Sequence, residues 1–354
     1  MKVLFLSAWY PTPQDMMAGL FVQKHAEAVA QQGHDVRVLY SNKTGIGWAR
    51  DMYMGWKQLK KEWGMPDIVQ MNVLDKNGVI AMWLKRRYHI PYIIVEHWSG
   101  YLPANFSFRA GWHGRLMRKI AQNASCILPV SQMLEDAMKQ CGICNKNWQR
   151  IHNVVDDFFF HPISPLTITP KGSKFRFLHV SCFDEKAKNI QGMLRAVREV
   201  AEQRQDFELM VVGTGVDYAA DVAYADSLNF PEDILHFTGE QTPYEVAQWM
   251  QESDCFVLFS RYETYAVVLA EAITKGLPFI STATAGIATD LPKECGITIE
   301  NENEDQLVAA IYHMLNKQER LNTASIKENS RFFHAQEIGK NLLAIYDRCL
   351  HSHI

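Results

Sequence analysis

The chain has 354 residues, of which 47% are hydrophobic and 21% are charged. Its length fits roughly two domains of ~150 residues each, and its apolar content excludes a globally disordered chain. The formal net charge of −3, from 36 basic and 39 acidic residues, excludes a generally basic protein, so we expect no nucleic-acid partner.

The first residues and the cysteines indicate a cytoplasmic protein. The apolar run at residues 3–6 is too short for a signal peptide and breaks at Tyr10 and Pro11, and no window is long enough for a membrane span. The seven cysteines are odd in number and scattered along the chain, which is typical of a cytoplasmic protein whose thiols stay reduced. For the lone C-x-x-C of Cys141 and Cys144, we favour ordinary thiols at the end of a helix over a zinc or redox site.

The first half of the chain alternates between strand-like and helix-like segments. Apolar or alternating runs predict strands, and apolar residues at helical spacing predict helices. The predicted strands are residues 3–6, 35–40, 67–71, 91–95 and 126–130. The predicted helices are residues 19–32, 48–63, 76–88, 111–122 and 132–140. This alternation predicts an α/β domain with a mainly parallel sheet.

A linker separates this half from a second alternating half. Residues 158–174 contain three prolines and a glycine among serines and threonines. The strands predicted after it are 175–180, 207–212, 234–237, 255–259 and 278–281, and the helices are 190–203, 244–252, 267–275, 305–315 and 331–350. We therefore predict two doubly wound, Rossmann-like domains, residues 1–163 and 164–330, that face a cleft. Such domains bind ligands in the loops that follow their strands.

Glycines and a lysine occupy such loops in the second half. Gly213 and Gly215 follow strand 207–212, where they allow either a close backbone approach to a ligand or a simple tight turn. Lys188 lies between strand 175–180 and the next helix, where a lysine can neutralise phosphate oxygens or be a solvated loop charge.

Two glutamates follow strand 255–259. Glu263 lies in the loop before the next helix, and Glu271 lies within that helix among apolar residues, where a carboxylate needs a hydrogen-bonding partner. Carboxylates at this spacing can hold hydroxyl groups of a polyol, with the helix N-terminus facing a phosphate. The alternative is one acid that complements the helix dipole and one surface acid.

In the first half, two loops hold candidate residues. Gly19 ends the loop after strand 3–6 and could bring its backbone close to a ligand. His97 follows strand 91–95 and is a candidate acid, base or binding group, although a lone histidine is more often structural. A basic, aromatic stretch could meet anionic lipids, although we favour an ordinary solvated helix; it comprises Phe106, Phe108, Arg109, Trp112, Arg115, Arg118 and Lys119.

The order of these motifs resembles that of the large retaining glycosyltransferase family with the GT-B fold, also known as family 4 or group 1. Glu263 and Glu271 match its E-x7-E motif and are followed by Lys-Gly-Leu-Pro at 275–278. Four further segments match in the same order: Gly-His-Asp-Val at 33–36, Ile-His-Asn-Val-Val-Asp at 151–156, Val-Gly-Thr-Gly at 212–215 and Phe-Thr-Gly at 237–239. The resemblance covers nearly the whole chain.

The resemblance implies a nucleotide-sugar donor bound by the C-terminal domain, a glycan or lipid-linked acceptor bound mainly by the N-terminal domain, and no metal or cofactor. Glu271 is expected to bind the ribose, Glu263 the donor sugar and Lys188 the diphosphate. His97 is expected beside the reacting sugar. Other expected donor-binding residues are Gly19, Gly213, Gly215, Arg261, Thr264 and Tyr265. The last helix, 331–354, is expected to cross back to the first domain, and peripheral membrane contact stays open.

The chain departs from the family pattern at several positions. Cys182 stands where the family usually has an arginine, and we expect Arg261, rather than Lys186, to supply the missing charge, unless Arg261 only pairs with an acid. Family glycines are replaced by Thr264, Ala266 and Val154, and the late glycine pair followed by Glu is Ala285-Gly286 with Asp290. A non-catalytic nucleotide-binding partner of a glycan-assembly complex is therefore the alternative to an enzyme. The E-x7-E motif argues against a sugar-nucleotide epimerase.

Overall fold

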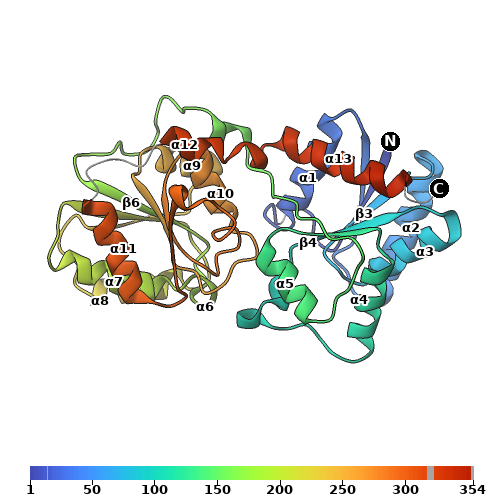
Figure 1. The fold of residues 1–354 in the computed structure, drawn as a ribbon, viewed down its shortest axis with the longest axis horizontal. Helices are drawn as coiled ribbons and strands as arrows, with labels where there is room; N and C mark the ends of the chain where they lie inside the picture. The colour runs from blue at the N-terminus through green and yellow to red at the C-terminus, as the bar shows by residue number, and fades with distance from the viewer. Residues whose placement is uncertain (14, 317–322, 352–354) are drawn as a thin grey trace. The chain divides into compact units, whose positions relative to one another are not determined.

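The computed structural model describes residues 1–13, 15–316 and 323–351, and it divides the chain into two compact units (Figure 1). Unit 1 comprises Met1–Val154 and Phe333–Ile354, and unit 2 comprises Val155–Phe332. Each unit is an α/β domain built on one parallel sheet. This arrangement confirms the predicted fold class.

The boundary between the units lies at Val154 and Val155, whereas the sequence places it after residue 163. The difference arises because the first residues of the expected linker belong to unit 2. They form a short 3-10 helix, η3 (Asp157–Phe160), that contacts helix α10 (Val267–Lys275). Lys275 Nζ donates hydrogen bonds to the carbonyl oxygens of Phe158, at 3.2 Å, and His161, at 2.6 Å.

Unit 1 has a five-stranded sheet in the order β2-β1-β3-β4-β5. Its strands are β1 (Lys2–Ser7), β2 (Asp35–Tyr40), β3 (Ile68–Asn72), β4 (Tyr92–Glu96) and β5 (Cys126–Pro129). Its helices are α1 (Leu20–Gln31), α2 (Gly45–Glu62), α3 (Gly78–Tyr88), α4 (Trp112–Asn123), α5 (Gln132–Gln140) and α13 (Ala335–His351). Strands β1, β3 and β4 are almost wholly buried, because helices cover both faces of a parallel sheet, which explains their continuous apolar runs.

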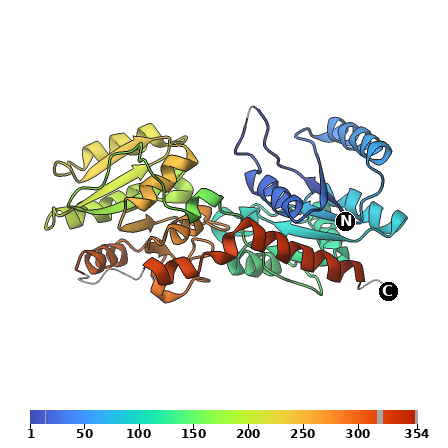
Figure 2. The same ribbon diagram turned by 90° about the horizontal axis from the view of Figure 1, so that it is seen from above.

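Helix α13 packs along α1 in unit 1 (Figures 1 and 2). A Cβ atom at Gly339 would lie 2.5 Å from the carbonyl oxygen of Ala28, so the glycine permits this close approach. Tyr346 donates a hydrogen bond of 2.5 Å to the side-chain oxygen of Gln70 on β3. Residues 333–351 therefore belong to unit 1, while residues 352–354 of the expected helix lie outside the described part of the chain.

Unit 2 has a six-stranded sheet in the order β11-β10-β9-β6-β7-β8. Its strands are β6 (Phe175–Val180), β7 (Phe207–Val212), β8 (Leu235–Gly239), β9 (Cys255–Leu258), β10 (Phe279–Thr282) and β11 (Gly296–Ile299). Its helices are α6 (Glu185–Lys188), α7 (Ile190–Ala201), α8 (Tyr218–Ser227), α9 (Pro243–Gln251), α10, α11 (Glu304–Asn316) and α12 (Thr323–Glu328).

The sequence analysis missed β11 and α8. β11 is an edge strand of four residues with a single buried position, so it lacks the apolar run that marks its neighbours. The sequence of α8, Tyr-Ala-Ala-Asp-Val-Ala-Tyr-Ala-Asp-Ser, has no apolar stripe at helical spacing.

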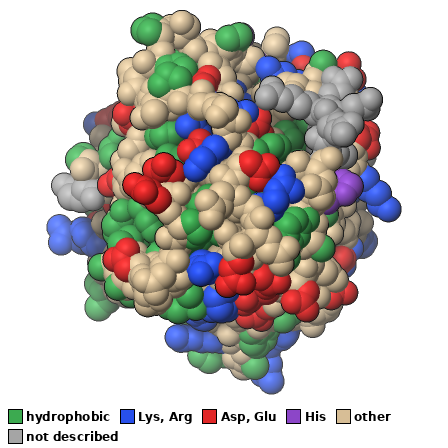
Figure 3. Space-filling view, turned by 90° about the vertical axis from the view of Figure 1, so that its left-hand side faces the viewer, with side chains coloured by type: hydrophobic (Ala, Val, Ile, Leu, Met, Phe, Trp, Pro, Cys, Tyr) green, Lys and Arg blue, Asp and Glu red, His purple; other side chains and the backbone are tan. Residues whose placement is uncertain are grey.

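The face of unit 2 shown in Figure 3 mixes acidic and basic side chains, with hydrophobic groups scattered among them. Exposed ion pairs of this unit include Arg195 with Glu304 and Arg204 with Asp206. A mixed surface of this kind is typical of contact with water. None of the helices in the described ranges is long and apolar enough to cross a bilayer.

Candidate functional site

Two charged residues meet at the carboxyl ends of neighbouring strands in unit 2. Lys188 ends α6, which follows β6, and Glu263 lies in the loop after β9. Strands β6 and β9 are adjacent, and the chain leaves them in opposite directions, toward β7 and β10. Open α/β sheets bind ligands at such a switch point. The position alone therefore identifies this loop cluster as the candidate site of unit 2.

The side chains of Lys188 and Glu263 form an ion pair, and they are only 13% and 15% exposed. The hydroxyl of Ser260 donates a hydrogen bond of 3.1 Å to the same carboxylate oxygen of Glu263. Burial lowers the pKa of Lys188, but the neighbouring acidic groups, Glu263 first and then Cys182 and Asp184, together outweigh burial, so the pKa is raised overall. Lys188 is therefore positively charged at neutral pH, and the pair fixes one cation and one anion at the strand ends.

A buried histidine supports the loop after β6. The His179 Nδ1 atom lies 2.9 Å from the carbonyl oxygen of Val257 on β9, and its Nε2 atom lies 2.8 Å from the Ser181 hydroxyl. Because a carbonyl only accepts, Nδ1 carries the proton and Nε2 accepts from Ser181. Burial lowers the pKa of His179 to about 4, so it is neutral at pH 7. The imidazole thus ties β9 to the first residue after β6.

Gly213 and Gly215 pack against this same loop. Gly213 has φ 128°, and a Cβ atom there would lie 2.0 Å from the carbonyl oxygen of Ser181. A Cβ atom at Gly215 would lie 2.5 Å from the backbone nitrogen of Phe183. The close approach that these glycines permit is therefore one between two loops of the protein itself. A direct contact with the donor stays a prediction.

Arg261 is bound to acceptors of the protein. Its Nε donates a hydrogen bond of 2.7 Å to the Glu302 carboxylate, and its Nη2 donates one of 2.6 Å to the side-chain oxygen of Asn189. Its Nη1 donates a hydrogen bond to the backbone carbonyl oxygen of Glu185 and lies 3.4 Å from the carboxylate of the same residue. This is the arrangement expected if Arg261 pairs with acids. To reach a phosphate, the guanidinium would have to leave these partners, so we now expect less from Arg261 than from Lys188.

In unit 1, Gly19 and His97 are brought together through α1. Gly19 precedes α1 in a left-handed conformation, φ 69°, and a Cβ atom there would lie 2.5 Å from the carbonyl group of Trp9. Two residues later the Phe21 ring stacks on the His97 ring, with centroids 3.9 Å apart. The loop after β1 and the end of β4 thus form one cluster.

His97 is buried and neutral. Burial, together with the neighbouring His25, holds the pKa of His97 well below its ordinary 6.5. The Nε2 atom of His97 has no hydrogen-bond partner among the described residues. A neutral imidazole with an unpartnered nitrogen is available to donate or accept one hydrogen bond from a ligand.

Glu96, which the sequence analysis missed, positions the backbone of His97. Its buried carboxylate accepts hydrogen bonds, each of 2.9 Å, from the backbone N–H groups of Leu74, His97 and Trp98. Burial raises the pKa of Glu96 to about 7, although the three N–H groups act against this shift. The sequence pattern that could have identified Glu96 is a charged residue at the end of an apolar strand, directly before the candidate histidine.

The raised pKa of Glu96 predicts a pH dependence of stability. Between pH 4.5 and about 7, the Glu96 carboxyl group binds its proton more tightly in the folded protein than in the unfolded chain. Protonated Glu96 therefore contributes to the free energy of unfolding fully below pH 4.5, and this contribution is lost as the pH rises through 7. Relative to the parent, the variant Glu96→Gln should gain about 3 kcal/mol in free energy of unfolding from pH 4.5 to about pH 8. Urea unfolding across this range measures it. The exposed Glu62→Gln is the control, and a parallel pair of curves for Glu96→Gln and the parent would contradict the prediction.

Two family profiles match successive parts of the chain. The profile described as "Glycosyltransferase Family 4" matches residues 18–157, and the one described as "Glycosyl transferases group 1" matches residues 174–317. The chain belongs to this glycosyltransferase family. The resemblance stated from the motifs is thereby confirmed.

Curated relatives of the chain include glycosyltransferases named for several substrates. The N-acetyl-alpha-D-glucosaminyl L-malate synthase of Bacillus anthracis is 27% identical over 49% of this chain and 45% of its own length. The lipopolysaccharide 1,6-galactosyltransferase of Escherichia coli K12 is 24% identical over 46% of this chain and 45% of its own. The matches thus span about half the length of these relatives.

Solved structures of the same fold cover almost the whole chain. The sucrose-phosphate synthase of Thermosynechococcus elongatus is 17% identical, with a TM-score of 0.77 over 99% of this chain and 100% of its own. HepE of Anabaena, solved in complex with UDP, is 18% identical, with a TM-score of 0.75 over 98% of this chain and 100% of its own. At these identities the likeness shows the fold, and it confirms two Rossmann-like domains.

The structure shows the surroundings of the positions at which the chain departs from the family pattern. Ala266, which replaces a family glycine, precedes α10 in a left-handed conformation, φ 61°, where a glycine would be unstrained. Gly286, which is retained, has φ 54°, and a Cβ atom there would lie 2.4 Å from the backbone of Tyr265. Cys182 exposes its thiol close to Lys188 and adds no cation. Glu271 is half-buried on α10, and Thr264 lies in the loop before it.

The remaining features singled out in the sequence are the basic, aromatic stretch and the C-x-x-C, and their side chains differ in burial. Phe108 is buried beneath Arg118, which donates hydrogen bonds to the carbonyl oxygen of Cys141, whereas Phe106 and Trp112 are 61% and 76% exposed. The C-x-x-C begins at the C-terminal end of α5, the position that the sequence predicts. Both of its cysteines are free thiols in the structure, and the choice between ordinary thiols and a zinc or redox site stays a prediction. Over the described ranges, no three His, Cys, Asp or Glu residues are grouped as metal ligands.

Proposed function

We propose that this protein is a retaining glycosyltransferase that moves a sugar from a nucleotide-diphosphate sugar to a glycan or lipid-linked acceptor in cell-surface polysaccharide synthesis. The observation that carries the proposal is the largely buried Lys188–Glu263 pair at the switch point of unit 2. The family membership and the UDP complex of the Anabaena protein support a nucleotide donor.

The pair suits the chemistry of glycosyl transfer. The bond between the sugar carbon and the diphosphate breaks through an oxocarbenium-like transition state, and negative charge develops on the departing diphosphate. Lys188 is held in place to neutralise that charge, and Glu263 is placed to accept hydrogen bonds from the sugar hydroxyls. In front-face transfer, a phosphate oxygen of the leaving group takes the proton of the acceptor, so the chain itself supplies no general base in this proposal.

A panel of UDP-, GDP- and dTDP-sugars, with and without glycan and lipid-linked acceptors, tests the proposal. We expect nucleoside diphosphate release with at least one donor, unchanged by a chelator, and a product that keeps the anomeric configuration of the donor. An inverted product would contradict the retaining mechanism. Binding of nucleotides without any turnover would favour the non-catalytic alternative, which Cys182 and the ion pairs of Arg261 support.

The roles expected for Glu271 and His97 predict that a substitution of Glu271 affects nucleotide binding, whereas a substitution of His97 affects turnover. Glu271→Ala should weaken nucleotide binding by roughly 10- to 100-fold, because the ribose hydroxyls lose a charged acceptor. His97→Phe, which keeps a ring stacked on Phe21, should leave nucleotide affinity unchanged and lower turnover. Calorimetry with UDP and GDP, together with the transfer assay, measures both. Unchanged affinity in folded Glu271→Ala, or full turnover in His97→Phe, would remove the corresponding residue from the site.

A lipid-linked acceptor would place unit 1 at the inner face of the membrane, and we include peripheral contact in the proposal. The exposed Phe106 and Trp112, with Arg109 and Arg115 nearby in the sequence, support it. We expect cosedimentation with anionic vesicles to fall when Phe106 and Trp112 are both changed to serine. Equal cosedimentation of this variant and the parent would exclude this surface.

A further inference from the structure

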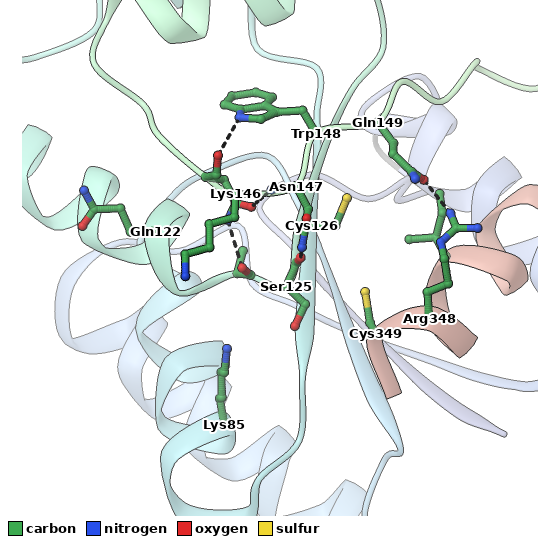
Figure 4. A pocket seen from close by; sticks show the side chains of 13 residues that line it. Lys85, Gln122, Ser125, Cys126, Lys146, Asn147, Trp148, Gln149, Arg348 and Cys349 are labelled. Atoms are coloured by element: carbon green, nitrogen blue, oxygen red, sulfur yellow. Dashed lines mark hydrogen bonds between the residues drawn. The ribbon is translucent and has the colours of Figure 1, made fainter. Parts of the chain in front are cut away.

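Two cavities of unit 1 differ in the character of their walls. The cavity of about 710 Å³ in Figure 4, beside β5, is lined mainly by polar side chains, such as those of Lys85, Lys146 and Asn147. A second pocket, of about 660 Å³, is lined mainly by apolar side chains. Its walls come from residues 101–110 of the loop between β4 and α4, from α4 itself and from the end of α5 (Figure 1). Its volume is within the range of small-molecule sites.

Aromatic rings form much of this apolar pocket. Tyr101 and Phe108 are buried, with ring centroids 5.3 Å apart, and Phe106 is 61% exposed. Pro103 and Ala110 also line it. Walls of this kind release water when a hydrocarbon chain covers them, so they favour an apolar ligand group.

One guanidinium group lines the same pocket. Arg118 lies over the ring of Phe108, with its guanidinium carbon 5.5 Å from the ring centroid. Its Nε and Nη2 atoms donate hydrogen bonds of 3.1 and 2.9 Å to the carbonyl oxygen of Cys141. Gly142 permits this approach, because a Cβ atom there would lie 3.0 Å from Arg118 Nε. Three of the five N–H groups of Arg118 are outside these bonds, so this fixed cation can bind an anion at the apolar wall.

The chain around the pocket is basic. Residues 97–134 contain no aspartate or glutamate, in a protein whose net charge is −3. They carry four cationic side chains, which are Arg109, Arg115, Arg118 and Lys119. The next acid along the chain, Glu135, is paired with Lys139 at 2.5 Å. This stretch therefore creates a local positive potential that attracts anions.

We propose that the apolar pocket holds the hydrocarbon chain of a lipid phosphate, and that Arg118 binds the phosphate. This site, which rests on the proposed function for its role in transfer, identifies the acceptor as lipid-linked through phosphate rather than as a free glycan. Tyr101 connects the pocket to the candidate site, because Trp98, the residue after His97, packs against its ring with centroids 5.1 Å apart. A lipid bound in the pocket is therefore held by the loop that carries His97.

Calorimetry with decyl phosphate tests the proposal on the full chain, without a sugar donor and at concentrations at which this amphiphile is monomeric. We expect decyl phosphate to bind about tenfold or more tightly than inorganic phosphate, which lacks the chain, and than decanol, which lacks the charge. Arg118→Met should remove the preference for decyl phosphate over decanol. Arg115→Met makes the same change in charge outside the pocket lining and should keep that preference.

Filling the pocket tests the same site without altering its cation. Ala110→Trp places a ring in the pocket from an exposed position and should weaken binding of decyl phosphate by about tenfold or more. Ala49→Trp, at an exposed position of α2, is the control and should leave this binding unchanged. Trp112→Ser removes an exposed ring that does not line the pocket and should also leave it unchanged, which separates this site from contact with a bilayer.

Equal binding of decyl phosphate by Ala110→Trp and the parent would overturn the proposal, as would equal weakening in Ala49→Trp. Equal affinities of the parent for decanol and decyl phosphate would overturn the role of Arg118. A dimer that Ala110→Trp dissociates, without any binding of decyl phosphate, would instead assign the pocket to a second copy of the chain.

The transfer assay tests whether the bound lipid is the acceptor. With a glycan linked to a lipid phosphate, Ala110→Trp should raise the KM for the acceptor about tenfold and leave the KM for the donor unchanged. An unchanged KM for this acceptor would show that the pocket does not hold it. Binding of decyl phosphate by a protein that transfers sugar to no acceptor would contradict the proposed function and leave the lipid site intact.

Discussion

Replacing Lys188 with methionine is expected to lower turnover by ~10²–10³-fold, because a preorganised cation at the leaving diphosphate is lost. The same change leaves the largely buried carboxylate of Glu263 without its ion-pair partner. Loss of one partner of a buried pair costs about 3–5 kcal/mol of stability. A loss of activity in the single variant would therefore not by itself separate catalysis from folding.

The double variant Lys188→Met with Glu263→Gln separates the two effects, because no charge is left without its partner. We expect its free energy of unfolding to return close to that of the parent, while turnover stays low. Lys186→Ala, an exposed residue of the same short helix, is the control and should keep turnover. Recovery of turnover in the double variant would show that Lys188 acts only on stability, and full turnover in Lys188→Met would remove Lys188 from the site.

Gly213→Ala is expected to lower the free energy of unfolding by about 3 kcal/mol or more, since a close-packed site must shift to admit the new methyl group. The methyl carbon would meet the carbonyl oxygen of Ser181 at 2.0 Å, and the backbone at φ 128° disfavours any side chain. Gly172→Ala is the matched control in the same unit, because no described atom lies within 4 Å of its added carbon.

Urea unfolding of these two glycine variants measures the difference directly. Gly213→Ala should also weaken nucleotide binding, because the displaced Ser181 loop leads to Lys188. A Gly213→Ala protein as stable as the parent would show that the two loops separate at no cost. In that case the ligand, rather than the carbonyl oxygen of Ser181, would be the reason that position 213 requires glycine.

Local sequence patterns were sufficient to predict the fold class and the strand ends at which the candidate site lies. Residues 3–6 and 255–258 are continuous apolar runs. Such runs are typical of strands that are buried on both faces of a parallel sheet, whichever helices cover those faces. The spacing of Glu263 and Glu271 is likewise local, because it depends only on one loop and one helix. Short-range periodicity and motif spacing are properties of the chain alone.

Which charged and polar groups meet in space depends on the tertiary structure. Lys188 and Glu263 are 75 positions apart, and no local pattern pairs them, nor does one direct Arg261 to Glu185 and Glu302 instead of to a ligand. The role of Glu96 depends on a backbone N–H group 22 positions away, at Leu74. Charges and hydrogen bonds act over a few ångströms in space, and the strand order that sets those distances arises from the packing of both sheets.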